Sequence, residues 1–154
     1  MLPNFHNGDY LLVDEISFRL RKPQRGEVVV FQPPNHNPSP YIKRIIGLPG
    51  ETIKISEGRV VILKERGGEV LDESAYLPAG VKTKGNLTVV LGKQEYFVLG
   101  DNRSFSSDSR IFGVVHYQEI IGRVFFRVLP LNRMGRIKGP NYQDLSLNFN
   151  YARG

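Results

Sequence analysis

The feature that most constrains the fold of this chain is the division of its apolar residues into short runs by glycine and proline. The 154 residues include 16 glycines and 10 prolines, with short runs rich in valine, isoleucine, tyrosine and phenylalanine between them. Such runs favour strands, and no long helical periodicity is present. The sequence predicts a mainly β fold, a single domain of several antiparallel sheets or a partly open barrel with long loops.

The positions of the strands follow from these runs. Strands are expected at residues 10–13, 27–31, 41–48, 52–56, 59–63, 87–91, 95–99 and 120–129. The alternation of Ile16, Phe18 and Leu20 with polar residues predicts one more strand, half-buried on a single face. Between two of the runs, Glu57-Gly58 is typical of a tight hairpin turn.

Polar, weakly patterned segments set the expected boundaries of the domain. The folded domain is expected to span residues 1–133, with an irregular insertion at about 64–86 and a polar tail at 134–154. No apolar run approaches the ~20 residues that a membrane-spanning helix needs.

Charge and composition argue against several classes of function. The net charge is +6, but the basic residues are scattered and do not interleave with aromatic residues as in single-strand-binding surfaces. We therefore expect no nucleic-acid partner. The chain has no cysteine, which excludes disulfides, zinc–thiolate sites and a cysteine nucleophile. The one dense basic run consists of Arg19, Arg21, Lys22 and Arg25.

Lys43 is the first candidate for chemistry. On a strand it shares a face with Tyr41 and Ile45, both of which are largely apolar. Loss of hydration on that face lowers the pKa of a lysine, and a neutral amine can act as a general base. The alternative is a lysine whose stem lies on the strand and whose amine reaches water. This segment alone leaves both readings open.

The second candidate is the polar loop at residues 100–110. It concentrates four serines, two aspartates and two arginines in eleven residues. A hydrogen-bonded surface turn explains this composition, and so does a scaffold whose hydroxyls and ion pairs orient a catalytic group.

Four segments together resemble the ordered motifs of type I signal peptidases, the leader peptidase family of Ser/Lys membrane proteases, in their bacterial, cyanobacterial or thylakoid form. The resemblance runs from Met1 to about Arg133. It rests on Met1-Leu2-Pro3, Arg25-Gly26-Glu27-Val28-Val29-Val30-Phe31, Tyr41-Ile42-Lys43-Arg44-Ile45-Ile46-Gly47-Leu48-Pro49-Gly50-Glu51, and the loop at 100–110 with Gly113 after it.

The resemblance implies a Ser/Lys dyad. In the family the nucleophile is the serine of a Ser-Met-x-Pro motif, so the matching serine would stand immediately before Met1, and the chain is expected to be truncated at its N-terminus and inactive as given. Lys43 matches the general base, and Ser106 matches the hydroxyl that positions this lysine.

The resemblance also assigns roles to other residues, without a metal or cofactor. Substrate-binding positions match Met1, Phe5, Tyr41 and Ile42. Structural ion pairs and loop positions match Arg44, Gly100, Asp101, Asn102, Arg103, Asp108 and Arg110, with Arg44 expected to pair with Asp101.

The implied function is a serine endopeptidase that removes N-terminal signal peptides from exported preproteins after Ala-x-Ala sites. Its partners would be preprotein signal peptides and a membrane lipid surface, and the protein would be a monomer. The full-length protein would be membrane-anchored, with this domain on the periplasmic, extracytoplasmic or thylakoid-lumen side. An exposed apolar surface around Phe5, Phe18 and Phe105 is expected to rest on the bilayer.

Three alternatives remain at this stage. One is a non-catalytic, peptide-binding pseudoenzyme, which the identity of the residue before Met1 would test. Another is a repressor-type, self-cleaving Ser/Lys peptidase, which would need an internal cleavage site. The third is a basic β-barrel that binds nucleic acid, which salt-dependent retention on DNA or RNA would reveal.

Overall fold

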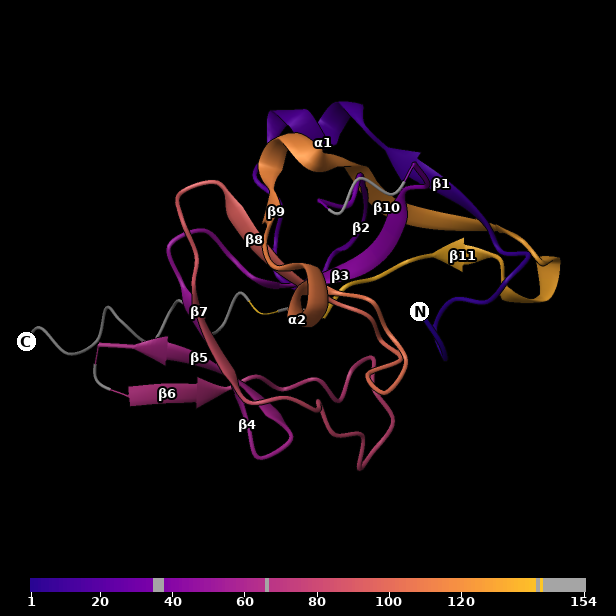
Figure 1. Cartoon of the computed structure of the whole chain (residues 1–154). Helices are drawn as coiled ribbons and strands as arrows, with labels where there is room; N and C mark the ends of the chain where they lie inside the picture. The colour runs from indigo at the N-terminus through magenta and orange to yellow at the C-terminus, as the bar shows by residue number, and fades with distance from the viewer. Residues whose placement is uncertain (35–37, 66, 141, 143–154) are drawn as a thin grey trace, which may run out of the picture.

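The computed structural model describes residues 1–34, 38–65, 67–140 and 142, which form a mainly β structure (Figure 1). This confirms the predicted fold class. The large sheet is antiparallel, in the order β1 (Tyr10–Asp14), β10 (Ile120–Leu129), β2 (Val28–Phe31), β3 (Tyr41–Gly47), β8 (Glu95–Leu99) and β9 (Val115–His116), with β11 (Gly135–Arg136) also on β10. The small sheet has the order β6 (Gly67–Val70), β5 (Arg59–Lys64), β4 (Thr52–Ser56) and β7 (Leu87–Val90).

The small sheet follows directly from a period of two in its sequence. β4 buries Ile53 and Ile55 and exposes Lys54, as expected for a strand with one face in the core. β4 and β5 are joined by Glu57-Gly58, where both residues have positive φ angles, 54° and 78°. Two positive φ values are typical of a tight hairpin turn, so the predicted hairpin is confirmed.

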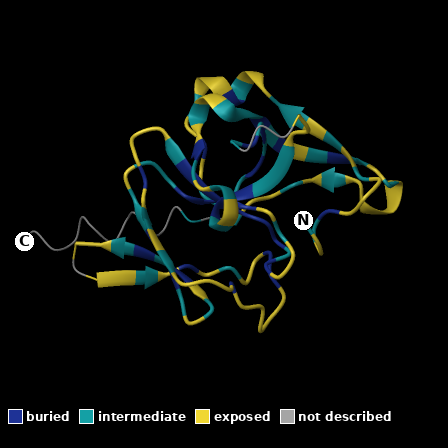
Figure 2. Cartoon of the chain, viewed as in Figure 1, coloured by how far each residue is buried: buried dark blue, intermediate teal, exposed yellow. Residues whose placement is uncertain are grey.

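β3 divides the core of the molecule, because its centre is covered on both faces. Ile45 packs with Phe18, Phe31 and other residues on one side, whereas Ile46 packs with Ile53 of the small sheet on the other. The buried residues, dark blue in Figure 2, gather where these strands meet. A charged residue on β3 is therefore removed from water more completely than its sequence pattern alone indicates.

The predicted strand through Ile16, Phe18 and Leu20 is wrong, because these residues lie in a short helix, α1 (Ile16–Leu20). The Asp14 carboxylate accepts a hydrogen bond of 3.0 Å from the backbone N–H of Ser17, which favours a helical turn. Residues two apart on a helix do not share a face. Phe18 is therefore buried, while Ile16 and Leu20 point outward with exposed fractions of 80% and 84%.

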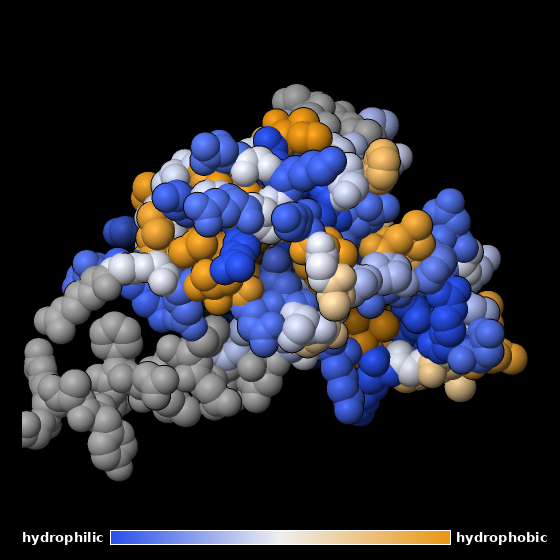
Figure 3. Space-filling model, turned by 90° about the horizontal axis from the view of Figure 1, so that it is seen from below, coloured by the Kyte–Doolittle hydropathy of each residue, from blue (hydrophilic) through white to orange (hydrophobic). Residues whose placement is uncertain are grey.

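The surface expected to rest on a bilayer needs a second correction. Phe5 and Phe18 are both core residues, and only Phe105 is exposed. Besides Leu2, the exposed apolar residues near the start of the chain are Tyr10, Leu12, Ile16 and Leu20, on β1 and α1. On the face seen from below, apolar residues form separate groups divided by hydrophilic side chains (Figure 3).

The segment expected to be an irregular insertion is more ordered than its composition indicates. It contains β6, which pairs with β5, and it contributes Leu71, Tyr76 and Leu77 to the core next to the small sheet. The expected tail begins with β11; its residues 141 and 143–154 lie outside the described residues. Among the described residues, no helix is both long and apolar enough to cross a membrane.

Candidate active site

Lys43 lies near the start of β3, opposite Val29 of β2. Its side chain is half-buried, and its amine lies 5.3 Å from the centre of the Tyr41 ring. Burial lowers the pKa of the Lys43 amine, and the negative charges of Asp108 and Asp101 only partly offset this effect. No ion pair of Lys43 is found in the described part of the chain. The neutral amine that a general base requires is therefore easier to reach at Lys43 than at a fully hydrated lysine.

Gly100 brings Lys43 and Ser106 together. A Cβ atom at Gly100 would lie 2.7 Å from Cβ of Ser106 and 3.6 Å from Cδ of Lys43, so both side chains pack against this glycine. The Ser106 hydroxyl oxygen is buried, and it lies near enough to the Asp108 carboxylate to help lower the pKa of Asp108. The structure thus places Ser106 beside Lys43, but without a hydrogen bond between them.

Two ion pairs hold the loop that carries Ser106. Arg44 donates from Nε and Nη2 to the two Asp101 oxygens at 2.9 and 2.7 Å, in a fork that is almost completely buried. Arg110 binds Asp108 in the same way, at 2.8 and 2.7 Å. Burial opposes the ionisation of Asp108, but hydrogen bonds from Arg110 and from the Gly100 N–H keep its pKa below the usual value. Both aspartates therefore present fixed negative charge near Lys43.

Arg103 connects the loop to a segment that carries no recognised motif. Its guanidinium donates to the Glu73 carboxylate at 2.7 and 2.5 Å, to the Gly100 carbonyl at 3.1 Å and to the Thr83 hydroxyl. Sequence analysis missed Glu73 and Thr83, because they lie 30 and 20 residues away from Arg103. Asn102 is half-buried, and its carbonyl accepts the Phe105 N–H in the same loop.

The N-terminal segment lies against this same ion-pair network. Burial lowers the pKa of the Met1 α-amine, and the positive charge of Lys43 lowers it further. The Met1 sulfur accepts the backbone N–H of Asp101 at 3.3 Å. The side chain of Asn4 donates to Asp101 Oδ2 and to the Tyr76 carbonyl, at 2.8 Å each. The start of the chain is therefore fixed beside Lys43 by hydrogen bonds.

Arg127 on β10 holds the same segment from its other side. It donates to the Asn4 carbonyl, lies over the Phe5 ring at 5.3 Å and pairs with Asp9 at 3.2 Å. Sequence analysis also missed Asn4, Asp9 and Arg127. Nothing in the local pattern marks them, because the contact between Arg127 and Asn4 joins residues 123 positions apart.

The expected substrate-binding residues are divided between two faces of β3. Met1, Phe5 and Ile42 share one apolar cluster. Tyr41 points to the other face, where its ring packs edge-on against Phe31 with centroids 6.3 Å apart. The structure therefore joins three of the four residues, as the alternation of side chains along a strand requires.

Arg25 and Glu51 connect two of the sequence motifs to each other. Arg25 donates to both oxygens of Glu51 at 2.8 and 2.5 Å and to the Ile46 carbonyl at 2.6 Å. The motif around Gly26 is thus tied to the one around Lys43 and Glu51. Among the described residues, no group of three or more histidine, aspartate or glutamate side chains is arranged to hold a metal ion.

Known proteins similar to this chain indicate its family. A sequence model of the family described as signal peptidase, peptidase S26, matches residues 1–129. The chain is 40% identical over 147 residues to a signal peptidase I of Leptolyngbya laminosa, covering 91% of this chain and 70% of that protein. It is 39% identical over 140 residues to a probable signal peptidase I-2 of Synechocystis sp., covering 88% and 62%, so it spans less than two thirds of that relative.

The fold is also similar to a solved structure. The crystal structure of a signal peptidase I from Enterococcus faecalis V583 matches with a TM-score of 0.55 and 31% sequence identity, over 67% of this chain and 97% of that one. The fold and the motifs thus define a β-rich peptidase domain. The chain belongs to the signal peptidase family, peptidase S26, as the ordered motifs predicted.

Proposed function

We propose that the chain is the catalytic part of a serine endopeptidase that removes N-terminal signal peptides from exported preproteins by means of a Ser/Lys dyad. The observation that carries this proposal is the half-buried Lys43 side chain packed beside Ser106 at Gly100, with Met1, whose nitrogen would carry the serine, held against Asp101 of the same loop. A serine bonded to that nitrogen would stand next to the base. Several relatives bear the name signal peptidase I.

In the proposed reaction the neutral Lys43 amine takes the proton of the serine hydroxyl as its oxygen attacks the scissile carbonyl. An ester to the serine forms, the peptide bond breaks, and Lys43 returns the proton to the leaving amine. Water then hydrolyses the ester, with Lys43 again as the base. Ser106 is proposed as a positioning residue, because its buried side chain packs beside that of Lys43 against Gly100.

The substrate is proposed to bind as an extended strand along the start of β3. β8 pairs with β3 only from Arg44 onward, so beside Ile42 and Lys43 the described residues supply no partner strand on that side. The cluster of Met1, Phe5 and Ile42 lies on the adjoining face. Small, apolar side chains of an Ala-x-Ala sequence suit such a shallow apolar surface.

Partners and location form the rest of the proposal. The protein would act as a monomer on preproteins at a membrane surface, anchored in its full-length form, with this domain on the periplasmic or thylakoid-lumen side. The exposed apolar residues Tyr10, Leu12, Ile16 and Leu20 supply a surface of the kind that contacts lipid.

The test is cleavage of an Ala-x-Ala peptide in detergent by a protein with serine placed directly before Met1. Lys43→Ala should lower the rate on the order of 10⁶-fold, whereas Lys54→Ala, on an exposed position of the small sheet, should leave it unchanged. The 154-residue chain itself should be inactive. If it shows cleavage that depends on Lys43, the nucleophile lies within the chain, and Ser106 and Ser109 become the residues to substitute.

A further inference from the structure

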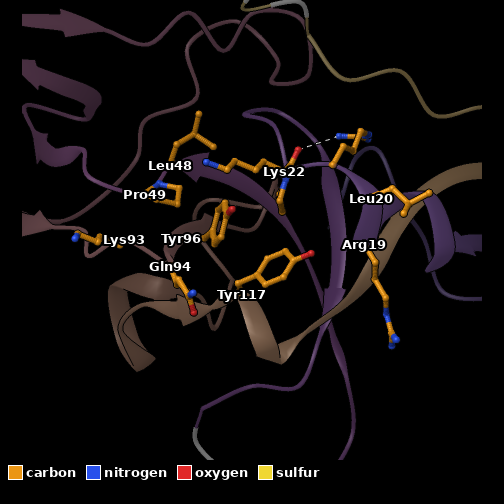
Figure 4. Close-up of a pocket in the computed structure, with 11 residues that line it drawn as sticks. Arg19, Leu20, Lys22, Leu48, Pro49, Lys93, Gln94, Tyr96 and Tyr117 are labelled. Carbon is orange, nitrogen blue, oxygen red and sulfur yellow. Dashed lines mark hydrogen bonds between the residues drawn. The ribbon is translucent and has the colours of Figure 1, made fainter.

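A pocket of 640 Å³ lies beyond the end of β3, between Leu48 and Tyr117 (Figure 4). Leu48 and Tyr96 line it, the first just after β3 and the second near the start of β8. At about 3.3 Å per residue, the five steps from Lys43 to Leu48 span about 16 Å. The pocket is thus remote from Lys43 and has no part in the chemistry proposed above. It is called the basic pocket below.

The basic pocket concentrates positive charge. Four of its lining residues are basic, and none is acidic. Arg21 pairs with Glu27, but in the described part of the chain no ion pair is found for Arg19, Lys22 or Lys93. Positive side chains gathered around one concavity attract an anion.

Two aromatic residues lie among these cations. In Figure 4 the rings of Tyr96 and Tyr117 occupy the middle of the view, with Lys22, Lys93 and Arg19 around them. The Tyr96 side chain is buried, and Tyr117 stacks on Phe18 with ring centroids 6.4 Å apart. The aromatic floor is therefore fixed to the core, while the charged ends around it stay exposed.

Exposed aliphatic residues adjoin the same charges. Leu20 lines the pocket, and Ile16 lies one turn earlier on α1; both are more than three-quarters exposed. Tyr10 and Leu12 continue the exposed apolar residues along β1, the edge strand of the large sheet. Exposed apolar side chains next to cations are typical of segments that lie in a membrane interface. An acidic peptide or free phosphate would use the cations but leave Ile16 and Leu20 in water.

We propose that the basic pocket binds the phosphate head group of an anionic phospholipid, while Ile16 and Leu20 enter the apolar boundary of the bilayer. This deepens the membrane contact included in the proposed function and rests on it. In this arrangement the end of the molecule that carries α1 faces the lipid. The basic pocket binds the head group there, and the apolar side chains of α1 contact the bilayer.

The test is flotation of the 154-residue chain with vesicles of phosphatidylcholine alone and with vesicles that also contain phosphatidylglycerol. The chain should bind the second kind far better, and a rise from about 0.05 M to about 0.5 M salt should release it. Substituting glutamine at Arg19, Lys22 and Lys93 together should weaken binding to phosphatidylglycerol vesicles on the order of 100-fold. Ile16→Ser with Leu20→Ser should weaken it as well.

The matched control removes the same charge elsewhere. Lys54, Arg59 and Lys82 are all exposed, and substituting glutamine for all three lowers the net charge by as much as the pocket variant does. This control variant should change vesicle binding less than threefold. If the two triple variants lost vesicle binding equally, the proposed lipid site in the basic pocket would be overturned, and only non-specific electrostatic attraction would remain. Binding that an acidic peptide competes away, with no effect of Ile16→Ser and Leu20→Ser, would assign the pocket to a peptide.

Failure of the pocket and failure of the peptidase proposal are distinguishable, because vesicle binding needs no catalysis. Thermal unfolding of each variant shows whether it is folded. A folded chain that binds neither kind of vesicle would overturn the lipid proposal, whereas the cleavage assay with serine before Met1 would still report on Lys43.

Discussion

The two sheets contain similar lysine-bearing strand segments, but the lysines differ in their exposure to solvent. Lys54 follows Ile53 on β4, and Lys43 follows Ile42 on β3, so each lysine sits in an apolar strand segment. Lys54 is exposed, whereas Lys43 is half-buried with a lowered pKa. The difference comes from what covers each strand: Lys54 lies on the open face of β4, whereas Lys43 lies next to the centre of β3, which is covered on both faces. The reactivity of a lysine is thus set by tertiary packing rather than by its neighbours in sequence.

The same contrast extends to ion pairs, and it gives the largest expected effect. The side chains of Arg44 and Asp101, at the large sheet, are 3% and 0% exposed, whereas those of Lys64 and Glu69, on the small sheet, are 39% and 33% exposed. Asp101→Ala leaves a buried guanidinium without its partner, so the free energy of unfolding should fall by about 3–5 kcal/mol. Glu69→Ala should cost less than about 1 kcal/mol. Urea unfolding of both variants measures the difference, and equal losses would contradict it.

Glycine substitutions test the packing around Lys43. A Cβ at Gly100 would lie 2.7 Å from Cβ of Ser106, whereas at Gly135 no atom lies within 4 Å of it. Gly100→Ala should therefore destabilise the fold by about 1–3 kcal/mol, the usual cost of overpacking, and should lower cleavage by the serine-extended protein because Ser106 must move. Gly135→Ala should do neither. An active, fully stable Gly100→Ala protein would show that the position of Ser106 beside Lys43 is not needed.

Sequence predicted the parts of this molecule that depend on local pattern. The hairpin of the small sheet followed from alternation and from Glu57-Gly58, and the ordered motifs indicated the family. The strand predicted through Phe18 failed, because the Asp14 carboxylate accepts the Ser17 N–H and favours a helical turn, on which Phe18 does not share a face with Ile16 and Leu20.

The parts that depend on distant contacts were not predictable. Glu73 lies in a segment that looks irregular, yet it binds Arg103 of the motif loop. Asn4 and Arg127 meet across 123 residues. One sequence carries no signal for such pairs, because each partner is an ordinary polar residue in its own surroundings.

Substitution of an asparagine near each sheet should have a smaller effect than the changes above, and Asn4 is the asparagine near the large sheet. Its side chain donates to Asp101 and to the Tyr76 carbonyl, so Asn4→Ala should lower the free energy of unfolding by about 1 kcal/mol. In the serine-extended protein it should also reduce the cleavage rate, since Asn4 fixes the segment beside Lys43. Asn86→Ala, at an exposed position next to the small sheet, is the control and should change neither quantity. A stable Asn4→Ala protein with an unchanged rate would show that Met1 is held by other contacts.

The smallest expected effect concerns the stability cost of Lys43 itself. Its pKa is lowered in the folded protein, chiefly by burial, so between that value and the unfolded pKa of about 10.4 the unfolded chain binds one more proton. The protein should therefore gain stability as pH rises through this window.

Lys43→Met removes the buried charge and should be more stable than the parent at neutral pH, with an advantage that shrinks toward zero above about pH 10. Lys54→Met should show no such pH-dependent gain, because Lys54 is exposed. Thermal unfolding of the three proteins across pH measures this. A Lys43→Met protein less stable than the parent at neutral pH would show that Asp101 and Asp108 outweigh the cost of burial, and that Lys43 is held as a cation rather than prepared as a base.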